Sequence, residues 1–126
     1  MNLLLDTHIV LWWLADHPRL SRQARALIVD DANDVSVSVA SLWEIAIKAG
    51  RSRLGVSAAE IEQASRDSGF GILAIEAAHV RALAALPQKH KDPFDRILIA
   101  QARSEPRYLL TSDKVLRGYG ETVLMV

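Results

Sequence analysis

The stretch "NLLLDTHIVLWWLADH", residues 2 to 17, decides the fold class of this chain. Its first four residues have the pattern of a buried strand, and from His8 onward the apolar residues recur at helical spacing. Asp6 stands between the two, directly after the apolar run. A strand that leads at once into a helix is the unit from which parallel sheets are built. We therefore expect the same unit again further along the chain.

The alternation of strand and helix continues to the end of the sequence. Strand patterns occupy residues 34–39, 71–75, 107–110 and 122–126. Helix patterns occupy residues 21–31, 41–51, 57–68, 76–87, 92–105 and, for a short segment, 112–118. Strands separated by helices of this length predict an α/β fold, with helices covering both faces of a mostly parallel sheet.

Length and composition limit the class of protein. The chain has 126 residues, so we expect a single domain over residues 1–126. Fifteen basic residues balance 15 acidic ones, which gives no overall charge signature of a nucleic-acid binder. The absence of cysteine excludes a disulfide framework and a thiolate metal site. The amino terminus resembles neither a signal peptide nor a membrane span, and we expect a cytoplasmic protein.

Four acidic residues stand where a parallel sheet places its ligands. Ligands of such sheets bind beyond the carboxyl ends of the strands, where the strand order reverses. Asp6 follows the first strand directly, Glu44 comes shortly after the second, and Asp113 follows the strand at 107–110. Asp95 joins them from the start of a late helix. These four residues are the candidate catalytic and metal-binding set.

Helix capping is the alternative explanation for the same residues. In "DPFD", residues 92–95, Asp92 has the place of an N-cap and Asp95 that of the third helical residue. "SLWE", residues 41–44, has the pattern of a capping box, and Asp113 also has a cap-like place. "SAAE", residues 57–60, is an equally good capping box but follows a turn, so we interpret it as a cap alone.

The clustering of four carboxylates predicts a metal ion. Carboxylates that converge on one crevice repel each other and raise each other's pKa unless a cation lies among them. With oxygen ligands, no cysteine and no histidine pair at ligand spacing, the expected ion is Mg²⁺ or Mn²⁺. A water made more acidic by such an ion can attack a phosphorus atom. Phosphodiester hydrolysis is the reaction class that this favours.

Four motifs resemble those of one enzyme family. They are "LLLDTHIVLWWL" (3–14), "SLWEIAIKAGRSRL" (41–54), "HKDPFDRILIAQA" (90–102) and "LLTSD" (109–113). In this order and spacing the chain resembles the PIN-domain ribonucleases, and most of all the VapC-type toxins of bacterial toxin–antitoxin pairs. Each motif is moderately specific by itself, and the four together cover nearly the whole chain.

The resemblance implies a three-layer α/β/α domain around a parallel sheet of about five strands. It also implies cleavage of RNA with Mg²⁺ or Mn²⁺, and it transfers the catalytic and metal-binding roles to Asp6, Glu44, Asp95 and Asp113. Asp92 matches a residue of the "DPFDR" subgroup, where we interpret it chiefly as the helix cap. The implied partners are a small antitoxin protein and a second copy of the chain, and DNA would be reached only through the antitoxin.

Several further residues are candidates for supporting roles. The hydroxyls of Thr7 and Ser112 could orient a carboxylate or hold a water, or they could equally cap adjacent helices. Arg96 could contact a phosphate or a nearby acid. His90 could touch RNA, although an exposed loop histidine is the interpretation we favour slightly. A basic cluster that could track phosphates comprises Lys48, Arg51 and Arg53.

Two other functions compete with RNA cleavage. Phosphoryl-transfer proteins of the haloacid-dehalogenase or receiver type also carry an aspartate after their first strand, but "DTH" lacks the second acid that the dehalogenase pattern requires. A receiver would need an acidic pair near the first strand and a mid-sheet aspartate, and neither is visible. The other alternative is a non-catalytic PIN-like module that binds protein or RNA. All four candidate acids are present, so nothing in the sequence supports a loss of activity.

Overall fold

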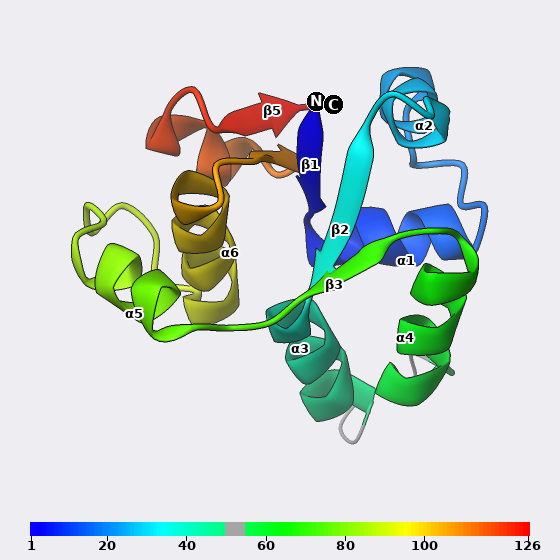
Figure 1. Cartoon of the computed structure of the whole chain (residues 1–126), viewed down its shortest axis with the longest axis horizontal. Coiled ribbons are helices and arrows are strands. Elements are labelled where there is room, and N and C mark those ends of the chain that lie inside the picture. Colours follow the sequence, from blue (N-terminus) through cyan, green and yellow to red (C-terminus); the bar gives the residue numbers. More distant parts are fainter. Residues whose placement is uncertain (50–54) are drawn as a thin grey trace.

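The structure, a computed structural model, describes residues 1–49 and 55–126. Its five strands form one parallel sheet in the order β3-β2-β1-β4-β5 (Figure 1). The strands are β1 (Asn2–Leu5), β2 (Asp34–Ser38), β3 (Gly71–Leu73), β4 (Tyr108–Thr111) and β5 (Val123–Met125). The expected α/β fold with a parallel sheet of about five strands is confirmed.

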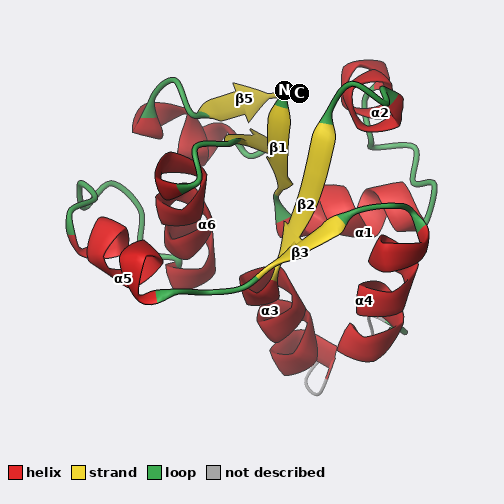
Figure 2. Cartoon of the chain, in the orientation of Figure 1, coloured by secondary structure: helices red, strands yellow, loops and turns green. Residues whose placement is uncertain are grey.

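Helices cover both faces of this sheet. They are α1 (Thr7–Leu14), α2 (Arg22–Val29), α3 (Val39–Ala49), α4 (Ala58–Asp67), α5 (Ala77–Ala84), α6 (Pro93–Ser104) and the 3-10 helix η1 (Lys114–Tyr119). In Figures 1 and 2, α1, α2 and α4 lie on one side of the strands, while α5 and α6 lie on the other. The arrangement is the three-layer α/β/α architecture.

The two hydrophobic cores follow from the alternation of side chains along each strand. Leu3 and Leu5 point into the core formed with α1, α2 and α4, and Leu4 points into the core formed with α6 and η1. All three leucines are fully buried. Because both faces of β1 are covered, its sequence is an uninterrupted apolar run, which is the pattern of a central strand in a parallel sheet.

The start of α3 differs from the prediction. The helix begins at Val39 and not after Ser41. Val39, which the strand pattern at residues 34–39 included, is therefore a helical residue, and its side chain is exposed. The alternative interpretation of residues 41–44 as a capping box is therefore wrong. The Ser38 side chain provides the hydrogen bond at this helix start. Its Oγ accepts from the Ala40 backbone N–H at 2.9 Å and donates to Gln101 Oε1 at 2.6 Å.

The other helix starts agree with the sequence. Ser21 and Ser57 cap α2 and α4 through their side chains, and Asp92 caps α6 with Pro93 as the first helical residue. Of the predicted basic cluster, Arg51 and Arg53 lie outside the described residues. Among the residues that the structure describes, no helix has both the length and the apolar character needed to cross a bilayer.

Strand order explains where a site can form. The chain builds β2 and then β3 on one side of β1 before it returns to place β4 on the other side. The order therefore reverses at β1, and the loops that leave β1 and β4 diverge there. A crevice at the carboxyl ends of these strands is the usual ligand position in open α/β sheets.

Candidate active site

Asp6 lies at this reversal point and is held by protein donors on both carboxylate oxygens. It follows β1 and is the N-cap of α1. Oδ1 accepts a hydrogen bond from the Thr7 backbone N–H at 2.7 Å, and Oδ2 accepts one from the Thr111 hydroxyl at 2.7 Å. The residue is only 3% exposed. Asp6 therefore caps α1, and the same hydrogen bonds hold its carboxylate at the carboxyl end of β1.

Burial determines the protonation behaviour of Asp6. It raises the pKa of this carboxyl above its ordinary value, and repulsion from Glu44 raises the pKa further. The hydrogen bonds from Thr111 and Thr7 and the charge of His8 oppose the shift. Two acids that repel each other at such a buried position indicate a site that a positive charge would stabilise.

Glu44 reaches the same region from the middle of α3. It is 4% exposed, and its Oε2 accepts a hydrogen bond from Lys48 Nζ at 2.6 Å, one helical turn later. That hydrogen bond raises the pKa of Lys48, and the negative charges of Glu44, Asp92 and Asp95 raise it further. The other oxygen, Oε1, is buried and has no hydrogen-bond partner among the described residues. Such an oxygen is unusual in a folded protein unless something binds there.

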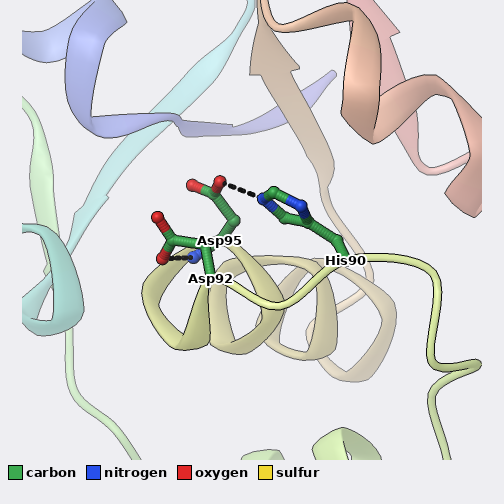
Figure 3. A group of neighbouring side chains, drawn as sticks. All are labelled: His90, Asp92 and Asp95. Carbon is green, nitrogen blue, oxygen red and sulfur yellow. Dashed lines mark hydrogen bonds and ion pairs between the residues drawn. The ribbon is translucent and has the colours of Figure 1, made fainter.

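Asp95 stands in the first turn of α6. Asp92 Oδ1 accepts hydrogen bonds from the backbone N–H groups of Phe94 and Asp95, which starts the helix. Asp95 Oδ2 contacts His90 Nε2 at 2.8 Å (Figure 3). Burial raises the pKa of Asp95 to about 6, the His90 contact opposes this shift, and repulsion from Asp6 and Asp92 adds to it. The prediction that His90 is an exposed loop histidine is wrong, because its ring is partly buried against Asp95.

Asp113 has a local role in the structure. It is the N-cap of η1, and its Oδ1 accepts a hydrogen bond from the Val115 backbone N–H at 3.0 Å. Its own backbone N–H donates to Thr111 Oγ1 at 3.0 Å. Asp113 is therefore connected to Asp6 through one threonine hydroxyl, whereas Asp6 is repelled by the charge of Glu44 and itself repels Asp95.

The supporting residues make contacts that the sequence did not predict. The Thr7 hydroxyl donates to Ser41 Oγ at 2.8 Å and so joins α1 to α3. Arg96 donates to the Leu86 carbonyl oxygen at 3.4 Å, and Ser112 is partly buried next to Asp113. Sequence reasoning missed Thr111. The signal was its place directly after the strand pattern at residues 107–110, two residues before Asp113.

The donors fit a divalent cation. Carboxylate oxygens predominate, and the buried Oε1 of Glu44 lacks a partner among the described residues. The ligand atoms of His90, Asp92 and Asp95 lie within 4.8 Å of one another, so they form a second group of donors at the amino end of α6. Hard cations such as Mg²⁺ and Mn²⁺ prefer oxygen ligands of this kind, and Mn²⁺ also accepts imidazole.

A pocket of about 520 Å³ lies beside these acids, between α1, α3 and α4. Thr7 and Lys48 line its end nearest the acids, and apolar side chains line much of the remainder, among them Trp12, Ile45 and Ile61. The pocket is therefore next to the candidate acids in the chain and through the Lys48–Glu44 pair, although none of the four acids lines it.

The comparisons with known proteins agree with this geometry. The family model described as PIN domain matches residues 3–121. The chain belongs to the PIN domain family. Its relatives include ribonuclease VapC22 of Mycobacterium tuberculosis, which is 30% identical over an alignment of 123 residues and is matched over 94% of this chain and 92% of that protein. The predicted resemblance to PIN-domain proteins of the VapC type is confirmed.

Solved structures show the same PIN-domain fold. VapBC2 from Rickettsia felis, bound to a DNA fragment from its promoter, superposes with a TM-score of 0.71 at 16% identity over 100% of this chain and 98% of that one. A toxin–antitoxin complex from Klebsiella pneumoniae superposes with a TM-score of 0.65 at 24% identity over 97% and 95% of the two chains. At sequence identities of 16% and 24%, these superpositions show a shared fold only.

Proposed function

We propose that this PIN domain is a Mg²⁺- or Mn²⁺-dependent endoribonuclease that acts as the toxin of a toxin–antitoxin pair. The observation that carries the proposal is the pair of buried acids Asp6 and Glu44, of which Glu44 has a buried oxygen, Oε1, with no hydrogen-bond partner among the described residues. The name of the 30% identical relative, a ribonuclease, supports the choice of RNA as substrate.

The carboxylates have separate roles in this proposal. Asp6, Glu44 and Asp95 would hold the cation, and Asp113 would support the site through Thr111. A bound divalent cation would supply a more acidic water as nucleophile and would offset the negative charge that develops on the phosphate. The Lys48 ammonium, paired with Glu44, adds a positive charge to the site.

The test is RNA cleavage by the purified protein, free of any partner. Cleavage is expected with Mg²⁺ or Mn²⁺ and should stop in EDTA. Equal cleavage in EDTA by a preparation free of contaminating nuclease would contradict the mechanism. The alternative function, a non-catalytic module, predicts that RNA is bound equally well with and without Mg²⁺ and is never cut.

The partners of the protein follow from the same proposal. A small antitoxin encoded beside the toxin would bind it and block cleavage, and contact with DNA would come through that antitoxin. The apolar pocket beside the acids suits a protein segment that carries apolar side chains. A short protein encoded next to this one should therefore co-purify with it and inhibit cleavage. The site of action in this proposal is the cytoplasm, where RNA is available.

A homodimer is also part of the proposal. Val39, Trp43 and Ile47 lie four residues apart on α3 and are 36%, 57% and 37% exposed. Residues at this spacing share one face of a helix. Trp43 also forms an edge-to-face contact with Phe94 at 5.0 Å, so the apolar strip extends to α6. We define these four residues as the α3 strip and propose that it pairs with its copy in a second subunit.

A further inference from the structure

His90 has no role in the function described so far, yet it makes the closest side-chain contact of Asp95. Its Nε2 lies 2.8 Å from Asp95 Oδ2, and the two side chains are 21% and 15% exposed. A histidine in a loop between two helices could instead point into solvent. Because it turns inward onto an acid of the candidate site, the contact requires an explanation.

The loop that carries His90 is fixed at several points. The Lys89 backbone N–H donates to the Pro87 carbonyl oxygen at 2.9 Å, and Lys89 Nζ donates to the Gly118 carbonyl oxygen at 2.9 Å. The Tyr119 hydroxyl donates to the same Pro87 oxygen at 3.3 Å. The loop is therefore attached to η1 before His90 and becomes the N-cap of α6 two residues after it. These contacts hold the backbone on both sides of His90, from where its imidazole reaches Asp95.

The two neighbouring carboxylates each use one oxygen for a protein contact. Asp92 Oδ1 caps α6, and Asp95 Oδ2 contacts His90. Figure 3 shows the other oxygen of each carboxylate on the side away from the imidazole ring. Asp95 Oδ1 is thus the oxygen that the His90 contact leaves available.

Without His90, two negative charges would repel Asp95, and Lys48 is the described positive charge that would still act against them. Asp6 and Asp92 both repel its carboxylate. An aspartate in the first turn of a helix can rotate about its side-chain bonds, and repulsion favours rotamers that turn the carboxylate away from the other acids. A donor at Oδ2 removes that freedom, which lowers the cost of ordering the ligand when a cation binds.

We propose that His90 is a positioning residue, which holds Asp95 Oδ2 so that Oδ1 is presented to a divalent cation. The proposal rests on the metal-dependent function described above. Loss of a partner that orients a metal ligand commonly lowers metal affinity by about 10- to 100-fold. His90 itself does not ligate the cation in this arrangement.

The test measures Mn²⁺ binding to the whole, partner-free protein by electron paramagnetic resonance of the free ion, with Mg²⁺ affinity obtained by competition. His90→Ala should raise the Kd for both ions by a similar factor, about 10- to 100-fold. His90→Gln keeps an N–H donor at nearly the same distance from the backbone and should restore most of the affinity. Gln88→Ala, in the same exposed loop, is the control and should bind like the wild type. Circular dichroism verifies that all four proteins are folded.

Two results would overturn the proposal. An unchanged Kd in His90→Ala would show that Asp95 needs no support. A large loss for Mn²⁺ with little loss for Mg²⁺ would show that His90 is itself a ligand, because imidazole favours transition metals. Failure of the proposed function is recognised separately: the wild type would bind Mn²⁺ in a His90-dependent manner and would leave RNA uncut.

Discussion

The Thr111 hydroxyl donates a 2.7 Å hydrogen bond to Asp6 Oδ2 and thereby joins the end of β4 to the residue that follows β1. Both residues are buried, at 0% and 3% exposure. The same hydroxyl oxygen accepts a hydrogen bond from the Asp113 backbone N–H. One side chain thus ties two candidate acids to neighbouring strands, at the point where the strand order reverses.

Thr111→Val should destabilise the protein and weaken cation binding. Valine keeps the branched shape but removes the donor to Asp6, which leaves a buried carboxylate oxygen with one partner fewer. The expected loss in the free energy of unfolding is about 1–3 kcal/mol, measured by denaturant titration. Thr122→Val is the matched control, because the Thr122 hydroxyl oxygen is buried without a partner among the described residues. It should be neutral or stabilising, and equal losses in both variants would argue against a special role of Thr111.

Asp6→Asn and Asp95→Asn should each lower RNA cleavage by orders of magnitude. Each replaces a proposed cation ligand with a neutral amide. Each also removes repulsion between acids, so the metal-free variant should be as stable as the wild type or more stable. Cleavage rates and thermal unfolding are measured on the same samples. Glu62→Gln, which alters a surface pair with Arg66, should keep full activity. If Asp95→Asn unfolds the protein while Asp6→Asn folds and keeps full activity, the two acids act in helix starts and not in catalysis.

Cation affinity should fall in acid because protons compete for Asp95. Its pKa is raised to about 6, so below that pH the apparent Kd for Mn²⁺ should rise by about tenfold per pH unit. The metal-free protein should respond in the opposite direction. An acid whose pKa is higher in the folded state contributes stability at low pH, and this contribution is lost as the pH rises through 6. Calorimetric titrations and thermal unfolding between pH 4.5 and 7.5, at about half-unit steps, test both effects. Both should be weaker in Asp95→Asn.

Ser38→Ala should destabilise the start of α3, from which Glu44 extends. The Ser38 hydroxyl donates to Gln101 Oε1 and accepts from the Ala40 N–H, and all of these groups are buried. Alanine leaves a donor and an acceptor unpaired, at an expected cost of about 1–3 kcal/mol in unfolding free energy. Ser104→Ala, at the exposed end of α6, should cost far less. If the two variants unfold alike, the buried contact is unimportant.

Trp43→Ser should convert a dimer into a monomer if the α3 strip pairs two subunits. Trp43 is the largest and most exposed member of the strip, and large aromatic residues dominate interface energies. Size-exclusion chromatography with light scattering measures the mass. Val29→Ser removes an even more exposed valine, at 67%, from α2 and should leave the mass unchanged. A wild type that is monomeric at all concentrations would contradict the proposal directly.

Local sequence determined the order and type of the elements. Apolar runs such as residues 3–5 form strands covered on both faces, and Ser21, Ser57 and Asp92 start their helices as predicted. These features depend on backbone groups within a few residues, so their pattern can be found in the sequence. The positions of Asp6, Glu44, Asp95 and Asp113 after strands or at helix starts were visible for the same reason.

Tertiary structure alone decided which of these side chains meet. The bond between Thr111 and Asp6 joins residues 105 positions apart, and that between Ser38 and Gln101 joins residues 63 positions apart. The latter contact holds Ser38 directly before α3, which begins at Val39 and not at the capping pattern of residues 41–44. His90 was interpreted as a loop residue because the attachment of its loop to η1 depends on residues about 30 positions later in the chain. Such contacts form only after the sheet brings distant segments together, so local sequence patterns cannot predict them.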